Sequence, residues 1–233
     1  MERLDKIISS QTGYSRKEVK DLIKAKRIKV NNQIAKKSDI KVEPALDEIL
    51  LDNEKIEVKK YVYLMLNKPK GYISATEDNT QPTVLDLIPT EYLHRNLFPA
   101  GRLDKDTTGL MLITDDGDFA HNILSPKKHI TKTYNVTIDI PMQEEMIKGF
   151  SEGIKLIDGD CKPSKLEITG EYTGIVTLTE GRYHQIKRMF GCYNAKVVEL
   201  ERIAMGNLNL PKDLNQGDSR EFTKEELLLI QGK

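Results

Sequence analysis

The sequence predicts an α+β fold in two domains, with a small basic domain at residues 1–59 and a larger domain at residues 60–233. Lys and Arg are concentrated near the N-terminus, where apolar residues at helical spacing give way to short strand-like segments. After residue 60, apolar strand-like runs alternate with short amphipathic stretches, which favours a mainly antiparallel mixed sheet with helices packed on it. At 233 residues the chain is long enough for two such domains.

The first domain is expected to begin with two short helices. Leu4, Ile7 and Ile8 recur at helical spacing. A second helix is expected after Ser15, which forms a capping-box pattern with Glu18. Strand-like runs follow at residues 28–30, 33–34, 48–51 and 55–58, and an Asn-Asn turn separates the first two of them.

The larger domain is expected to begin with the apolar run at residues 61–66, which ends at a turn containing Pro and Gly. Thr223 and Glu226 form a second capping-box pattern, which predicts a last helix. Further strands are expected at residues 110–114, 133–138, 166–169, 175–179 and 196–200. Helices are expected at residues 83–88, 119–124, 143–150 and 184–190.

The charge of the chain is balanced in total but not along its length. Lys and Arg total 36, as do Asp and Glu, yet residues 1–41 contain twelve Lys or Arg against five Asp or Glu. A local positive field attracts phosphate backbones whatever the total charge is. The basic N-terminal domain is therefore a candidate for binding nucleic acid, and an ordinary solvated helix surface is the alternative.

Several classes of protein are excluded by what the sequence lacks. No apolar run approaches the roughly 18 residues that a membrane-spanning helix needs, and the N-terminus has no secretory-signal pattern. Cys161 and Cys192 match neither a CxxC pair nor a zinc knuckle. The sequence also has no GxGxxG, P-loop or HExxH motif. We expect a cytoplasmic protein without a membrane segment, and neither a dehydrogenase, a kinase nor a zinc enzyme.

Three N-terminal segments resemble the S4 RNA-binding domain: RLDK at residues 3–6, SR at residues 15–16 and IKVNN at residues 28–32. In that domain two helices present basic residues to structured RNA. The resemblance covers about the first 60 residues and implies RNA contacts at five positions, for each of which an ordinary surface role is the alternative. These positions are Arg3, Lys6, Ser15, Arg16 and Lys17.

The densest group of polar residues is the segment GRLDKDTTG at residues 101–109, which runs directly into the strand expected at residues 110–114. Polar side chains held between glycines and a buried strand are a common setting for catalytic groups. On spacing alone, a turn stabilised by an Asp side chain is the simpler interpretation.

This segment, extended to Leu110, resembles the catalytic signature of pseudouridine synthases of the RsuA and RluA type. Three other segments match that family in the expected order: NKPKG at residues 67–71, KTY at residues 132–134 and EGRYHQIKRM at residues 180–189. With the S4-like start, the resemblance spans nearly the whole chain. It implies that the protein converts uridine to pseudouridine, and the last segment is most similar to the enzymes that modify one uridine of 16S ribosomal RNA.

The resemblance also implies roles for individual residues. Asp104 is expected to be the catalytic carboxylate, acting either as a covalent nucleophile or as the base that removes the C2′ proton. Tyr134 is expected to stack on a flipped-out base, and Lys187 to pair with Asp104. Further contacts with the RNA substrate are implied for Arg102, Lys68, Arg182, Gln185 and Arg188, with Lys68 mainly shaping the pocket.

Asp106 is expected to brace the loop, and His184 to make structural hydrogen bonds. The isomerisation gains and loses no atom, so no cofactor or metal is expected. The expected partner is 16S ribosomal RNA in an assembling small subunit, and the enzyme is expected to be a monomer. The alternatives are the same reaction on a uridine of 23S ribosomal RNA and a non-catalytic RNA-binding factor for ribosome assembly. A methyltransferase is a weaker alternative, because the chain has no recognisable cofactor-binding loop.

Overall fold

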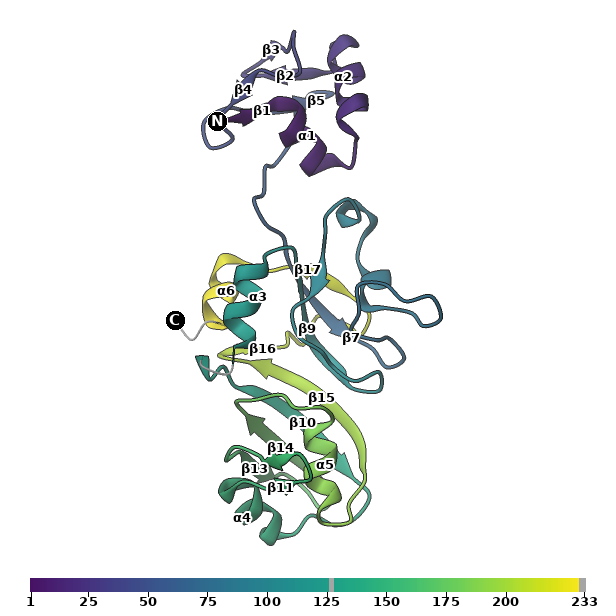
Figure 1. The fold of residues 1–233 in the computed structure, drawn as a ribbon, viewed down its shortest axis with the longest axis vertical. Coiled ribbons are helices and arrows are strands. Elements are labelled where there is room, and N and C mark those ends of the chain that lie inside the picture. The colour runs from purple at the N-terminus through teal and green to yellow at the C-terminus, as the bar shows by residue number, and fades with distance from the viewer. Residues whose placement is uncertain (126–127, 231–233) are drawn as a thin grey trace. The chain divides into compact units, whose positions relative to one another are not determined.

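The computed structural model describes residues 1–125 and 128–230, which form two compact units. The first unit contains Met1–Val62 and Ile88–Leu97, and the second contains Tyr63–Leu87 and Phe98–Lys233 (Figure 1). The sequence predicts a boundary between two independently folding domains at residues 59 and 60. This boundary stays a prediction. Within the described parts of the chain, none of the helices has the length and hydropathy that crossing a bilayer requires.

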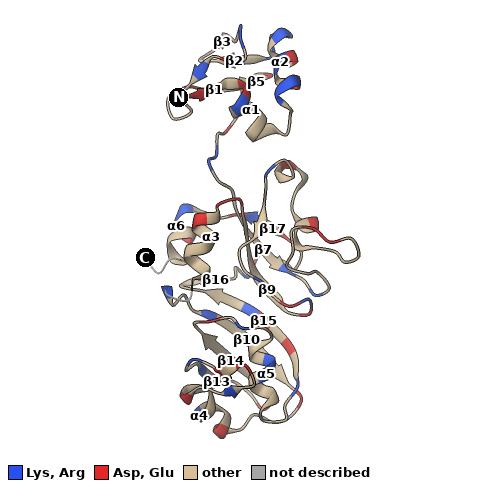
Figure 2. Cartoon of the chain, in the orientation of Figure 1, with Lys and Arg blue, Asp and Glu red and all other residues tan. Residues whose placement is uncertain are grey.

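The first unit contains the two expected helices, α1 (Leu4–Thr12) and α2 (Arg16–Lys24). The capping box of α2 is confirmed, because Ser15 Oγ accepts from the N–H of Glu18 at 3.2 Å and the N–H of Ser15 donates to Glu18 Oε2 at 2.7 Å. Apolar residues of both helices, among them Leu4, Ile8 and Val19, form one buried cluster. The cationic residues of α2 are exposed. Figure 2 shows them in blue along this helix.

Six short strands accompany these helices. Four form a sheet in the order β3-β2-β5-β6, and the other two, β1 and β4, pair with each other. Their bounds are β1 (Glu2–Arg3), β2 (Ile28–Val30), β3 (Gln33–Ile34), β4 (Lys41–Val42), β5 (Ile49–Leu51) and β6 (Glu54–Lys55).

The segment at residues 88–97, which includes the short 3-10 helix η2 (Thr90–Tyr92), belongs to the first unit although it lies far along the chain. Arg95 donates to the carbonyls of Ser10, Lys59 and Lys60 at 3.1–3.2 Å. Three backbone carbonyls held by one guanidinium fix this segment against α1 and the end of the first unit.

The second unit is built on a nine-stranded sheet, in which every pair of strands is antiparallel except β15 and β9. Its main order is β13-β14-β10-β15-β9-β7-β17, with β8 paired to β9 and β16 paired to β15. The strands are β7 (Tyr63–Lys68), β8 (Phe98–Pro99), β9 (Thr108–Thr114), β10 (Lys132–Ile138), β13 (Lys165–Ile168), β14 (Thr173–Leu178), β15 (Val197–Met205), β16 (Leu208–Asn209) and β17 (Ser219–Glu221). The predicted mixed, mainly antiparallel α+β fold is therefore confirmed.

In the part of the second unit that the structure describes, the sheet is accompanied by four α-helices, the 3-10 helix η1 (Val84–Leu87) and a small hairpin. The expected helix at residues 83–88 is only this 3-10 turn. The capping box of the last helix is present, because Thr223 and Glu226 bond reciprocally. The remaining elements are α3 (Gly117–Leu124), α4 (Glu144–Glu152), α5 (Gln185–Gly191), α6 (Lys224–Ile230), β11 (Lys155–Leu156) and β12 (Gly159–Asp160).

Four residues lie in one row across four neighbouring strands of the large sheet. Tyr134 pairs with Arg202, Arg202 pairs with Gly109, and Gly109 pairs with Lys68. Gly109 has φ +98°, and a Cβ atom there would lie 2.3 Å from the carbonyl oxygen of Arg202. Only glycine permits this conformation and this close approach together. The row thus places the loop that precedes β9 within reach of β10.

Candidate active site

A cavity of about 460 Å³ opens beside the loop that contains Asp104, in the second unit. The loop precedes β9, and Tyr134 of β10 and the start of α5 also line the cavity. A surplus of cations over carboxylates makes such a cavity attractive to a phosphate-bearing ligand. Its charged lining consists of Arg102, Lys105, Arg182 and Lys187 against Asp104.

Hydrogen bonds from residues 71–74 hold the Asp104 loop in place. Ser74 Oγ donates to the carbonyl of Leu103 at 2.7 Å and accepts from the N–H of Leu103 at 2.9 Å. The N–H of Gly71 donates to the carbonyl of Lys105 at 2.8 Å, and the N–H of Thr107 donates to the carbonyl of Asp104 at 3.1 Å. The Asp104 carboxylate is thus carried by a backbone that is fixed on both sides.

Lys68, at the end of β7, supports the same loop from inside the protein. The side chain is completely buried, and Nζ donates to the carbonyls of Pro69, Lys105 and Thr107 at 3.1, 3.2 and 2.9 Å. Burial lowers the pKa of Lys68 to about 8, although the two carboxylates of the loop oppose this shift. Loop carbonyls surround the Lys68 Nζ, which agrees with a role in shaping the pocket, and the expected contact of Lys68 with RNA stays a prediction.

Replacing Lys68 by Met is expected to flatten the rise of stability with pH. A lysine with a pKa of about 8 in the folded protein and 10.5 as its ordinary value binds fewer protons when folded, so stability increases as the pH rises between these values. Losing one such group lowers the slope of the unfolding free energy by up to about 1.4 kcal/mol per pH unit. Urea unfolding at pH 8, 9 and 10 measures this slope.

Lys148 of α4 provides the control for this measurement, because Lys148→Met removes a lysine whose side chain is exposed. This variant is expected to keep the slope of the unmodified protein. Equal slopes in the Lys68→Met variant and the unmodified protein would contradict the burial of an ionisable group at this position.

Lys187, in the first turn of α5, is shared by two carboxylates. Its Nζ lies 3.0 Å from Asp104 Oδ2 and 2.6 Å from Asp106 Oδ1. Burial alone would lower the pKa of Lys187, but the hydrogen bonds and charges of the two Asp residues raise it. Burial alone would likewise raise the pKa of Asp106, but Lys187 holds it below its usual value. Lys187 therefore stays cationic beside Asp104 at neutral pH.

His184 lies near the other carboxylate oxygen of Asp104. Its Nε2 lies 3.5 Å from Asp104 Oδ1. His184 immediately precedes α5 and adopts φ 46° and ψ 36°. This left-handed conformation costs a non-glycine residue about 1–2 kcal/mol. A strained backbone that directs an imidazole at the Asp104 carboxylate marks His184 as part of the site, beyond the structural role that the sequence predicts.

Tyr134 lies across the cavity, on β10. Its side chain is mostly buried, as are Lys132 and Val136, whereas Thr133 and Asn135 are more exposed. Side chains of a strand alternate between its two faces. The Tyr134 ring therefore lies on the face of β10 that borders the cavity, and Asn135 lies on the opposite face. The cavity is therefore bounded by an aromatic ring as well as by the Asp104 carboxylate.

The basic segment around the start of α5 is tied to the small hairpin at residues 158–160. Arg182 donates to the carbonyls of Asp158, Gly159 and Asp160 at 2.6–3.1 Å, and Arg188 forms an ion pair with Asp158. Gln185 accepts from the N–H of Arg182 at 2.9 Å and donates to Glu180 at 2.7 Å. The cavity is lined by Arg182, Gln185 and Arg102 but not by Arg188. The contacts of these four residues with RNA stay predictions.

The five predicted RNA-contacting positions of the first unit differ in their local contacts. Arg3 pairs with the buried Asp5 at 2.7 Å, and Lys6 pairs with Glu2 at 2.7 Å. Ser15 caps α2, so its hydroxyl oxygen is engaged with the backbone. Arg16 and Lys17 are exposed at the start of α2. These last two side chains are therefore the ones that offer charge most directly to a ligand.

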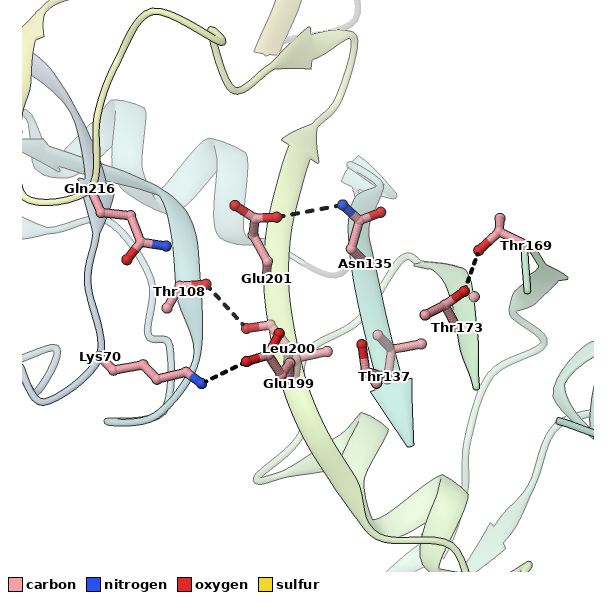
Figure 3. Close-up of a pocket in the computed structure, with 12 residues that line it drawn as sticks. Lys70, Thr108, Asn135, Thr137, Thr169, Thr173, Glu199, Leu200, Glu201 and Gln216 are labelled. Carbon is pink, nitrogen blue, oxygen red and sulfur yellow. Dashed lines mark hydrogen bonds and ion pairs between the residues drawn. The ribbon is translucent and has the colours of Figure 1, made fainter. Parts of the chain in front are cut away.

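A larger hollow, of about 640 Å³, lies on the face of β10 that carries Asn135 (Figure 3). Its polar groups bond one another, with Lys70 3.2 Å from Glu199 and Asn135 donating to Glu201 at 3.4 Å. Two carboxylates and one ammonium in the lining disfavour a phosphate-bearing ligand. The smaller cavity beside Asp104 is therefore the candidate site.

Some supporting residues have no clear signal in the sequence. Ser74 and His184 act on the loop across long sequence separations, which no local periodicity encodes. Asp106 stands two residues from Asp104, and this spacing could have indicated that both carboxylates reach the same cation. Arg202 is fully buried in β15 and donates to the carbonyl of Leu110 at 2.6 Å, which a charged residue inside an apolar strand could have indicated.

Comparison with protein families finds two matches along the chain. The family model described as RNA pseudouridylate synthase matches residues 62–191, and the S4 domain model matches residues 2–47. The larger match includes the Asp104 loop, Tyr134 and the start of α5, while the smaller match includes α1 and α2.

Full-length relatives agree with both matches. The chain is 42% identical to an uncharacterized RNA pseudouridine synthase of Bacillus subtilis over 98% of each chain. It is 40% identical to the ribosomal small subunit pseudouridine synthase A of Escherichia coli over 98% of this chain and 99% of that protein. A crystal structure of a pseudouridylate synthase, 38% identical, aligns over 99% of this chain and 100% of that chain with a TM-score of 0.70.

Proposed function

Since this chain belongs to the RNA pseudouridylate synthase family and carries an S4 domain, we propose that it converts one uridine of 16S ribosomal RNA to pseudouridine, at the position equivalent to 516. The proposal rests on one arrangement above all: the carboxylate of Asp104, paired with Lys187 at 3.0 Å, in a cationic cavity that Tyr134 also lines. The proposed RNA target is inferred from the relatives that are named for the ribosomal small subunit.

The reaction is an isomerisation. The bond between C1′ and N1 of the uridine breaks, a bond forms between C1′ and C5, and the proton lost from C5 is balanced by one gained at N1. No atom is gained or lost, so the proposal includes no cofactor. A uridine inside folded RNA must first be flipped out to reach a cavity of this kind.

Each side chain of the cavity has a part in this reaction. Asp104 acts beside the sugar, either by attacking C1′ or by removing the C2′ proton. Lys187 pairs with the Asp104 carboxylate at 3.0 Å and holds it in position. The ring of Tyr134 stacks on the flipped uracil. Arg102, at the cavity wall, contacts the RNA backbone.

The proposal is tested by chemical mapping of pseudouridine, with carbodiimide modification and primer extension, in 16S and 23S ribosomal RNA from cells with and without the gene. Loss of one 16S site, restored by the unmodified gene and not by Asp104→Asn, is the expected result. Loss of a 23S site instead would keep the reaction and overturn the target. No lost site in either RNA would favour the non-catalytic assembly factor.

The S4 domain is proposed to hold the ribosomal RNA while the cavity acts on one nucleotide. In this proposal the protein works as a monomer in the cytoplasm, on RNA of an assembling small subunit. The exposed cations Arg16 and Lys17 of α2 contribute to the attraction, since each phosphate that they neutralise releases counterions.

Replacing Arg16 and Lys17 together by Gln is expected to weaken RNA binding and to reduce its salt dependence. Two lost phosphate contacts lower the slope of log Kd against log salt by about 1.5. Filter binding to 16S RNA between 50 and 300 mM salt measures the slope. The control replaces Lys148 and Lys165, which are exposed and do not line the cavity, by Gln. Equal slopes for the two double variants would rule out a role of α2 in phosphate binding.

A further inference from the structure

Two stacked rings stand at the cavity beside Asp104. The ring centroids of Tyr183 and His184 are 3.9 Å apart, with an angle of 18° between the ring planes. Both residues line the cavity, yet the Tyr183 side chain is 74% exposed. Among the residues that the structure describes, no Tyr or Phe is more exposed. One face of the Tyr183 ring is therefore covered by His184, and the other is open.

The backbone holds this stack rigidly. His184 has a left-handed conformation, and it is followed directly by α5. The carbonyl of His184 accepts from the N–H of Arg188 at 2.9 Å, and the carbonyl of Tyr183 accepts from Arg188 Nη1 at 3.1 Å. A strained conformation that is held on both sides, at an active site, indicates that the position of these rings matters for function.

The stack is also close to the reacting position. The imidazole that stacks on Tyr183 is also the one whose Nε2 lies 3.5 Å from Asp104 Oδ1. The cavity, at about 460 Å³, suits one flipped nucleotide rather than several. The neighbouring nucleotides of the RNA must therefore lie outside the cavity, where they have lost a stacking partner.

We propose that the open face of Tyr183 stacks against the base of a nucleotide that flanks the flipped uridine. An aromatic side chain offers such a base a stacking surface without reading its sequence, since every base has a π-face. Arg102 and Lys105 also line the cavity and supply positive charge for the phosphate between the two nucleotides. This inference rests on the proposed function, because it assigns a second nucleotide to the same site.

Tyr183→Ala is expected to raise the KM for 16S RNA about 5- to 150-fold, the equivalent of about 1–3 kcal/mol for stacking one base. The kcat is expected to fall much less, because the flipped uridine keeps Asp104 and Tyr134. Tyr183→Phe keeps the ring and is expected to restore the KM. The control is Tyr172→Ala, which removes an exposed tyrosine outside the cavity.

A second measurement does not depend on turnover. RNA that carries 2-aminopurine beside the target uridine is titrated with each variant, and the chain contains no Trp to interfere with the fluorescence. Quenching by the unmodified protein and by Tyr183→Phe, and its loss in Tyr183→Ala, is the expected result. Equal quenching by Tyr183→Ala, an unchanged KM, or a loss confined to kcat would each overturn the stacking role.

The two proposals fail in different ways. If the unmodified protein forms no pseudouridine, the proposed function fails, and the 2-aminopurine titration still decides whether Tyr183 stacks on a base. If pseudouridine forms and the Tyr172→Ala and Tyr183→Ala variants behave alike, only the stacking role of Tyr183 is overturned.

Discussion

Replacing Asp104 by Asn is expected to lower pseudouridine formation by about four orders of magnitude or more while leaving RNA affinity nearly unchanged. The amide has the shape of the carboxylate but can neither attack C1′ nor accept the C2′ proton. The site should otherwise keep its geometry, because Lys187 retains its 2.6 Å contact with Asp106. Single-turnover assays on 16S RNA, combined with filter binding, measure both quantities.

Asp106→Asn is the matched control, since it removes the other carboxylate that pairs with Lys187. The Asp106 side chain is 68% exposed, whereas the Asp104 side chain is 26% exposed. The ion pair of Lys187 with Asp106 is therefore more exposed to water and contributes less. We expect a loss of activity of about tenfold or less in this variant. Turnover retained by Asp104→Asn, or a larger loss in Asp106→Asn, would exchange the roles assigned to the two residues.

Replacing Gly109 by Ala is expected to destabilise the protein by about 3 kcal/mol or more. The new Cβ would lie 2.3 Å from the carbonyl oxygen and 2.9 Å from the nitrogen of Arg202, and φ +98° is unfavourable for Ala. Both contacts are with backbone, which cannot move aside as a side chain could. Gly109 lies in β9 and pairs with Arg202 of β15. We therefore expect the strain to displace the Asp104 loop, which directly precedes β9.

Urea unfolding measures the change in stability, and turnover of the fraction that remains folded measures the displacement of the loop. Gly117→Ala provides the control, because a Cβ at Gly117 meets no atom within 4 Å and the residue lies in the first turn of α3. That variant is expected to change stability by less than about 1 kcal/mol. An unfolding midpoint of Gly109→Ala within the range of Gly117→Ala would contradict the close approach of the two strands.

Local patterns in the sequence predicted most elements of the fold. The capping boxes at Ser15 and at Thr223 place the starts of two helices correctly, because a cap depends on residues only three positions apart. The structure differs from the prediction in the length or type of two elements. The strand expected at residues 196–200 extends as β15 to Met205, and the helix expected at residues 83–88 is a 3-10 turn, because pairing and packing set these limits.

Three features of the site were decided only by the tertiary structure. Lys68 is enclosed by loop carbonyls, Lys187 is shared between two carboxylates, and His184 points at Asp104 from a left-handed backbone. Each feature depends on the register of strands or on contacts between segments distant in the chain. A charged residue in a motif does not reveal whether its partner is water, a carbonyl or another charge.

The sequence by itself determined the order of the motifs, the basic character of the first 41 residues and the identity of the family. These properties belong to residue types and short spacings, which can be read without a fold. The row from Tyr134 through Arg202 and Gly109 to Lys68 could be determined only by the structure. It depends on which strands are neighbours and in which register, and that is set by how the whole sheet packs.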